Sequence, residues 1–147
     1  MSVRNLNYSE IIHNILGIDK LITCAIIAKI NDGRILASKY RDDESMPLLT
    51  TKESELSVIQ SLIRMSMRRS LEYKFGKTVY ASTVYENVTR ASMYVFNDGR
   101  KRKEEDELIL MISFDKNADH EQIINSKILP FLNEMCRMLS PSTSAAC

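Results

Sequence analysis

The sequence has little glycine, proline and cysteine, and it has no tryptophan. Its 147 residues include four glycines, three prolines and three cysteines. So little glycine and proline excludes a collagen-like or low-complexity chain. The cysteines (Cys24, Cys136 and Cys147) are odd in number and have no CxxC spacing, which argues against a disulfide framework and against a cysteine-bound zinc ion. We expect Cys24 and Cys136 to be small buried thiols.

An excess of charge of either sign is also missing. The chain has 20 basic and 19 acidic residues, so its formal net charge is +1. A dedicated nucleic-acid-binding protein usually carries a large basic excess, and an acidic disordered chain carries the opposite excess. We therefore expect no nucleic-acid partner.

Long hydrophobic runs are absent. The longest uncharged apolar run covers residues 21–28, far short of the roughly 20 residues that a membrane-spanning helix needs. The first twenty residues lack the apolar core of a secretory signal. These features predict a cytoplasmic protein without membrane insertion, and the length predicts one domain.

Signatures of catalysis are lacking as well. The four glycines stand apart from one another, so no phosphate-binding glycine loop is present. The GxSxG and HExxH patterns do not occur. His13 and His120 are far apart, and neither has a neighbour at the spacing of metal ligands. We expect no enzyme activity, no cofactor and no metal.

What the sequence does contain is clear periodicity. Apolar spacing predicts helices at residues 8–16, 51–75 and 119–139, the first capped by Asn7. Apolar and β-branched runs predict strands at residues 21–30, 34–40, 77–85, 89–97 and 107–115. Asn31-Asp32-Gly33 is a typical hairpin turn, and residues 41–50 read as a polar loop. Pro130 must either kink the last helix or begin a new one.

The order of these elements is α-β-β-α-β-β-β-α. Strands joined by short connections pair antiparallel, and three helices can cover both faces of such a sheet. This predicts an α+β three-layer sandwich with a five-stranded antiparallel sheet. We expect a single domain at residues 1–139 and a flexible tail at 140–147.

The long predicted helix carries more apolar residues than one sheet face can cover. One stripe contains Leu56, Ile59, Leu62, Ile63, Met67 and Leu71, and a second group contains Val58, Met65 and Phe75. One sheet face can cover only one stripe, so the remainder needs another cover. We predict a homodimer built on this helix and the following strand.

That strand has the features of an unprotected sheet edge. Residues 78–85 contain no charge and no proline, and such an edge pairs readily with a copy of itself. The predicted dimer interface includes Met67, Leu71, Val79, Ala81 and Thr83, with Ala81 or Thr83 close to its symmetry mate.

A basic cluster follows the middle of the same helix. Residues 64–77 contain five basic residues and one acidic residue. Arg64 and Arg68 are four residues apart and share a helix face. We assign Arg64, Arg68 and Arg69 to the binding of an acidic partner or a phosphate group. The alternative is a solvated face that favours the negative end of the helix dipole.

The chain resembles the roadblock/longin superfamily of profilin-like folds over residues 8–139. The Asn31-Asp32-Gly33 turn between apolar strands, followed by ILAS at 35–38, resembles the opening hairpin of the family. Residues 108–114 and the helix from Asp119 resemble its closing strand and helix. The stretch DKNADHEQIINSKILPFL is also similar to small archaeal roadblock-like proteins.

The resemblance implies one long helix on one face of the sheet and the terminal helices on the other. It also implies dimers that serve as platforms for small Ras-like GTPases, without catalysis of their own. The leading hypothesis is therefore a non-enzymatic dimeric interaction platform that binds or regulates such a GTPase. Two alternatives stay open: a profilin-like sensory domain that binds a small molecule, and a GTPase-activating protein that supplies an arginine in trans.

Overall fold

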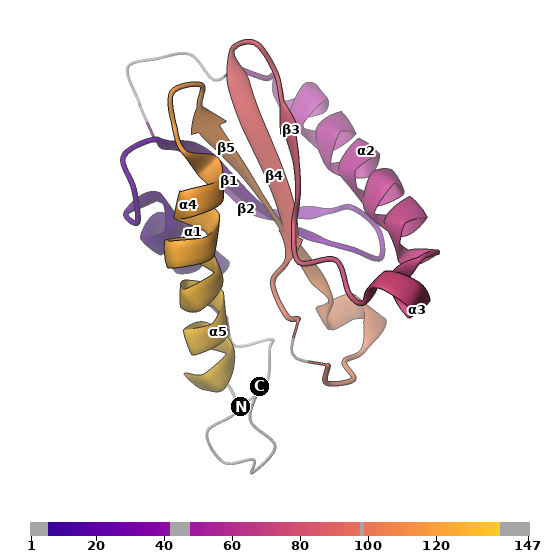
Figure 1. Ribbon diagram of the computed structural model, residues 1–147. Coiled ribbons are helices and arrows are strands. Elements are labelled where there is room, and N and C mark those ends of the chain that lie inside the picture. Colours follow the sequence, from indigo (N-terminus) through magenta and orange to yellow (C-terminus); the bar gives the residue numbers. More distant parts are fainter. Residues whose placement is uncertain (1–5, 42–47, 98, 139–147) are drawn as a thin grey trace.

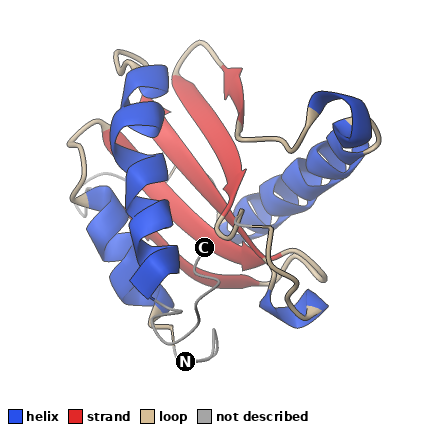
Figure 2. Cartoon of the chain, turned by 60° about the horizontal axis from the view of Figure 1, so that its bottom comes forward, coloured by secondary structure: helices blue, strands red, loops and turns tan. Residues whose placement is uncertain are grey.

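The computed structural model describes residues 6–41, 48–97 and 99–138 (Figure 1). The predicted tail at 140–147 and most of the predicted loop at 41–50 lie outside these ranges. Within them the chain forms one central sheet with helices on both faces (Figure 2).

The sheet has five strands in the spatial order β2-β1-β5-β4-β3. The neighbouring strands all pair antiparallel, which confirms the predicted fold class. The strands are β1 (Ile22–Lys29), β2 (Ile35–Tyr40), β3 (Ala81–Val84), β4 (Val88–Tyr94) and β5 (Leu108–Asp115).

Strand β3 is shorter than the predicted strand at 77–85, because the chain before Ala81 is held elsewhere. The backbone N–H of Thr78 donates to the carboxylate of Glu72 at 3.0 Å, which ties this segment to the short helix α3 (Glu72–Phe75) rather than to β4. The hydrogen bond is also the largest cause that lowers the pKa of Glu72. As predicted, β3 lies at one edge of the sheet.

The helices form two separate layers. Helix α1 (Tyr8–Leu16) and the C-terminal helices α4 (His120–Ile123) and α5 (Leu129–Met138) cover one face, and α2 (Thr51–Arg69) lies on the other (Figures 1 and 2). The first layer encloses the larger core cluster, which includes Ile15, Phe114 and Ile124. The three-layer arrangement is therefore the one expected.

The two cysteines that the structure describes are both buried. Cys24 is a free thiol buried under α2, and burial raises its pKa to about 11. Cys136 is buried as expected.

The long helix ends earlier than its periodicity predicts. Helix α2 stops at Arg69, where the backbone N–H of Leu71 donates to the carbonyl of Arg68 at 3.2 Å and tightens the last turn. The separate helix α3 then ends just before Gly76. The φ of Gly76 is 85°, a left-handed conformation that favours glycine. At its start, α2 is capped by Thr50, whose hydroxyl accepts from the N–H of Glu53 at 3.1 Å. Glu53 returns a bond to Thr50, which completes a capping box.

Pro130 neither ends the last helical segment nor starts it. It is the second residue of α5, which follows α4 through a π-helical turn, Ile124–Ile128. The N–H of Leu129 donates to the carbonyl of Ile124, five residues back. Because proline lacks an N–H and crowds the carbonyl four residues before it, a wider turn accommodates it without breaking the helix.

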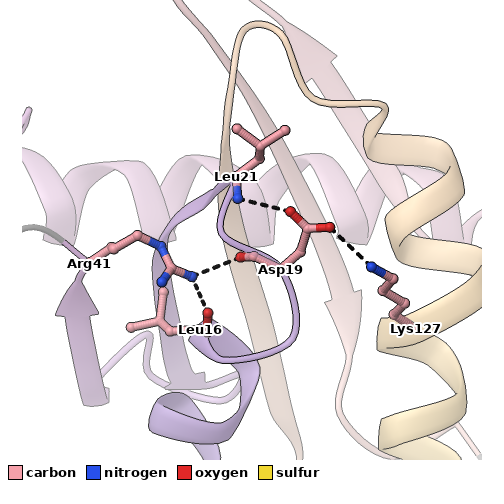
Figure 3. A network of polar contacts seen from close by, with 5 residues as sticks. All are labelled: Leu16, Asp19, Leu21, Arg41 and Lys127. Carbon is pink, nitrogen blue, oxygen red and sulfur yellow. Dashed lines mark hydrogen bonds and ion pairs between the residues drawn. The ribbon is translucent and has the colours of Figure 1, made fainter.

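A polar network fixes the terminal-helix layer to the sheet (Figure 3). Arg41 follows β2, and its guanidinium donates to the backbone carbonyls of Leu16 and Asp19, and to that of Ile22 at 2.7 Å. The carboxylate of Asp19 accepts from the N–H of Leu21 at 2.9 Å and pairs with Lys127 at 3.1 Å. The network therefore joins the chain after α1, the end of β2 and the π-helical turn.

Candidate interaction surface

Helix α2 turns its shorter apolar group to the sheet. Val58 and Met65 are buried against β1 and β5, with Leu62 half-buried beside them. Apart from Leu62, the longer stripe points away from the sheet, and Met67 is 69% exposed. The sequence indicated Val58, Met65 and Phe75 as the group left outside the stripe, and this is wrong for Val58 and Met65, which are the residues that the sheet covers.

Further large apolar side chains are exposed in the segment that follows α2. We call the exposed set the apolar face of α2; it comprises Leu56, Ile59, Ile63, Met67, Leu71, Tyr73, Phe75 and Val79. Phe75 is 81% exposed. So many exposed large apolar side chains in one segment of a soluble protein indicate an interaction site.

The edge strand β3 lies at the end of this surface. Thr83 and Val84 are exposed and Ala81 is half-buried. Strand β3 has a neighbour on one side only, which is β4. The predicted interface residues Met67, Leu71, Val79 and Thr83 are therefore all accessible in the single chain.

The structure separates the three predicted arginines. Arg64 and Arg68 line a narrow crevice between α2 and the β3–β4 hairpin, together with Ala81 and Thr83. Arg69 turns to another partner: its Nε donates to the hydroxyl of Tyr94 at 2.9 Å, and its guanidinium lies 5.0 Å from the centre of that ring. Arg64 and Arg68 therefore lie together at the crevice, and Arg69 does not.

Sequence reasoning missed a further arginine in the crevice. Arg90 on β4 lies directly opposite Thr83 on β3 and reaches the crevice from the sheet. Its Nε is buried and has no hydrogen-bond partner. The alternation of side chains along a strand places Arg90 on the same face as Ser92 and Tyr94, and this signal could have identified it.

A metal-binding arrangement is not found in the parts of the chain that the structure describes. No group of three or more His, Cys, Asp or Glu side chains there could hold a metal ion. No helix within the described ranges is both long and apolar enough to cross a membrane. The distinctive features of this surface are an exposed apolar face, an open strand edge and an arginine-lined crevice.

Comparison with known proteins gives results at the level of structure. No family model matches the sequence, and no curated protein matches it. Several solved structures match over most of the chain. The roadblock/LC7 domain from Streptomyces avermitilis has a TM-score of 0.64 at 10% identity, covering 89% of this chain and 96% of that one.

Two MglB proteins are similar to a comparable degree. MglB from Thermus thermophilus has a TM-score of 0.60 at 14% identity and covers 86% of this chain and 87% of its own. MglB from Myxococcus xanthus has a TM-score of 0.57 at 10% identity and covers 87% of this chain and 96% of its own. Identities this low establish the architecture alone: the chain has the roadblock fold.

Proposed function

We propose that the protein is a non-enzymatic dimeric platform that binds a small Ras-like GTPase. The observation that supports a dimer is the apolar face of α2 together with the open edge of β3. Water contact with so many large side chains is unfavourable by roughly 25 cal/mol for each Å² of apolar surface. A second copy of the chain would cover this surface and extend the sheet across a two-fold axis.

Self-association is also found in a protein of similar fold. One structure that matches this chain, with a TM-score of 0.60 at 13% identity, is described as MglB with a tetrameric arrangement. The GTPase partner is supported by the roadblock resemblance. Arg64 and Arg68 are exposed and close to the edge strand, where an acidic partner surface would reach them.

Light scattering at tens of micromolar tests the dimer. We expect a dimer for the unaltered protein and a monomer for Ile63→Glu combined with Met67→Glu, because charges would have to be buried in the interface. Lys116→Glu is the matched control, since it changes the net charge by the same two units at an exposed position outside α2 and β3. A monomeric unaltered protein would overturn the proposal.

Capture on purified Ras-like GTPases tests the partner. Binding should depend on whether GTP or GDP is bound, and Arg64→Glu with Arg68→Glu should weaken it, more so at low salt. Equal capture of the double variant would argue against the arginines as contacts. A GTPase-activating role would instead appear as faster GTP hydrolysis that is lost in Arg64→Ala or Arg68→Ala while binding persists.

A further inference from the structure

A cleft of about 990 Å³ opens between α2 and the sheet. Its walls are largely apolar and include Leu48, Leu56, Tyr85 and Val88, and its sheet side includes Tyr40. Ligand-binding clefts in proteins measure about 300–1,000 Å³ and combine apolar walls with a few polar groups. The volume of this cleft lies at the upper end of that range.

The cleft joins the arginine crevice. Ser57, Gln60, Tyr85 and Arg90 line both spaces, so the two form one continuous site with an apolar part and a cationic part. Arg90 lies at their junction.

The crevice itself is cationic and rich in hydroxyl groups. Three guanidinium groups line it, and none of its lining residues is acidic. Arg64, Arg68 and Arg90 form no salt bridge with any residue that the structure describes. A buried donor without an acceptor, such as the Nε of Arg90, costs about 1–3 kcal/mol, so an anion at this point would stabilise the fold.

The other charged groups of the cleft do not neutralise it. Glu53 accepts from the backbone N–H of Thr50 at 2.9 Å, and Glu86 lines the cleft without lining the crevice. Arg41 is occupied by the backbone carbonyls of Leu16, Asp19 and Ile22. The uncompensated positive charge therefore lies in the crevice, at Arg64, Arg68 and Arg90.

We propose that this site binds a small monocarboxylate with an apolar body. The crevice has a volume of only about 40 Å³, so it suits a small anionic group such as a carboxylate and not a larger charged group. Arginine binds carboxylates through paired hydrogen bonds. The apolar body then lies in the wider cleft, against Leu56, Tyr85 and Val88.

This site shares Arg64 and Arg68 with the proposed GTPase platform, and it adds Arg90. Arg90 reaches the crevice from the sheet, whereas Arg64 and Arg68 are exposed on α2, so Arg90 is the residue that separates the two proposals. Dimerisation and GTPase capture test the platform proposal, and ligand binding by variants of Arg90 tests the ligand site.

Calorimetric titration with octanoate, which is monomeric in the millimolar range, tests the ligand site. We expect one octanoate per chain, bound at least about tenfold more tightly than octanol or inorganic phosphate, because a charge-assisted pair and apolar contact act together. Arg90→Met should weaken binding at least about tenfold without lowering the melting temperature of the free protein, since it removes an unpaired buried donor. Gln60→Trp, which fills the junction, should abolish binding.

Arg34→Gln is the matched control, because Arg34 is exposed in the β1–β2 turn and outside the cleft; it should bind octanoate normally. Undiminished binding by Arg90→Met, or equal binding of octanol, would overturn the proposal. Phosphate binding as tight as that of octanoate would show that the apolar part plays no role and would also overturn it. Sedimentation with oleate-containing vesicles in the absence of octanoate binding would assign the site to a membrane-held carboxylate instead of a free one.

Discussion

The Cα of Gly33 lies so close to Ile59 that a Cβ added there would come within 2.5 Å of its Cδ1 atom. Gly33 belongs to the β1–β2 turn and has a φ of 75°, whereas Ile59 belongs to the apolar face of α2. The β1–β2 turn therefore packs against the middle of α2. A change in the conformation of this turn would displace Ile59, which belongs to the proposed dimer surface.

Gly33→Ala should destabilise the protein through two effects. A left-handed conformation costs a residue with a Cβ about 1–2 kcal/mol, and the new methyl group must also displace Ile59. Gly99→Ala is the control for the first effect, because Gly99 has a φ of 78° and its added Cβ would meet nothing closer than 4.0 Å. Urea unfolding should show a larger loss for Gly33→Ala, and Ile59→Ala should remove the difference. Equal losses would argue against the contact.

The two methionines near the end of α2 should respond differently to truncation. Met65 is 2% exposed and Met67 is 69% exposed, although they are two residues apart on one helix. Met65→Ala should cost about 2–5 kcal/mol of unfolding free energy at every protein concentration. Met67→Ala should change the stability of the monomer by less than about 0.5 kcal/mol.

The concentration dependence separates folding from association. If Met67 lies in a dimer interface, Met67→Ala should lower the melting temperature only at concentrations where the unaltered protein is dimeric. Calorimetry at several concentrations measures this. A large loss for Met67→Ala at high dilution, with a small one for Met65→Ala, would mean that α2 presents its opposite side to the sheet.

The Asp19 network predicts acid sensitivity of the unaltered protein. The hydrogen bond from Leu21 is the largest cause that lowers the pKa of Asp19, and Lys127 and Arg41 lower it further. A carboxyl group whose pKa is lowered in the folded state stabilises the protein above its unfolded pKa of about 3.9. That contribution is lost as the pH falls through the lower, folded-state pKa.

Asp19→Asn should therefore be less stable than the unaltered protein at pH 6, by up to about 1 kcal/mol for a solvent-accessible pair. The difference should vanish near pH 2. Urea unfolding between pH 2 and pH 7 measures it, and the remaining acid loss in the variant reflects groups such as Glu72, whose pKa is also lowered. A difference that stays constant with pH would contradict the network.

The sequence predicted the elements well because their signals are local. Asn7 caps α1 by accepting from the N–H of Glu10, as its position before an apolar stripe indicates. The uncharged strand at the sheet edge and the antiparallel neighbours were also predicted correctly. The end of the long helix was not predicted correctly. The segment after it is fixed by the hydrogen bond between the N–H of Thr78 and Glu72, and this bond depends on how the chain returns to the sheet.

The candidate site was harder to predict because it depends on contacts between distant segments. Arg64 and Arg68 could be identified from the sequence, because their spacing places them on one face of a helix. Arg90 is isolated in a strand, and only the pairing of Thr83 with Arg90 brings it to the crevice. A charged residue on the covered face of a strand is nevertheless a local signal, since such a position is usually apolar.

The last prediction concerns the open edge of β3. The N–H of Tyr85 donates to the carbonyl of Val88 at 2.8 Å. Because N–H groups alternate in direction along an antiparallel strand, the N–H of Thr83 also faces β4, whereas those of Ser82 and Val84 face outward. A second copy that extends the sheet would accept hydrogen bonds from these two outward groups and would place Thr83 opposite its own symmetry mate.

Val84→Pro should therefore abolish the dimer and leave the monomer folded, because proline removes an outward donor without touching the bonds to β4. Thr83→Pro is the matched control: it removes an inward donor, so it should lower the unfolding free energy of the monomer by about 1 kcal/mol or more. Light scattering measures association, and urea unfolding at high dilution measures the monomer. A dimer that persists in Val84→Pro while Thr83→Pro dissociates would show that the copies do not join through this edge, and the apolar face of α2 would then have to associate without extending the sheet.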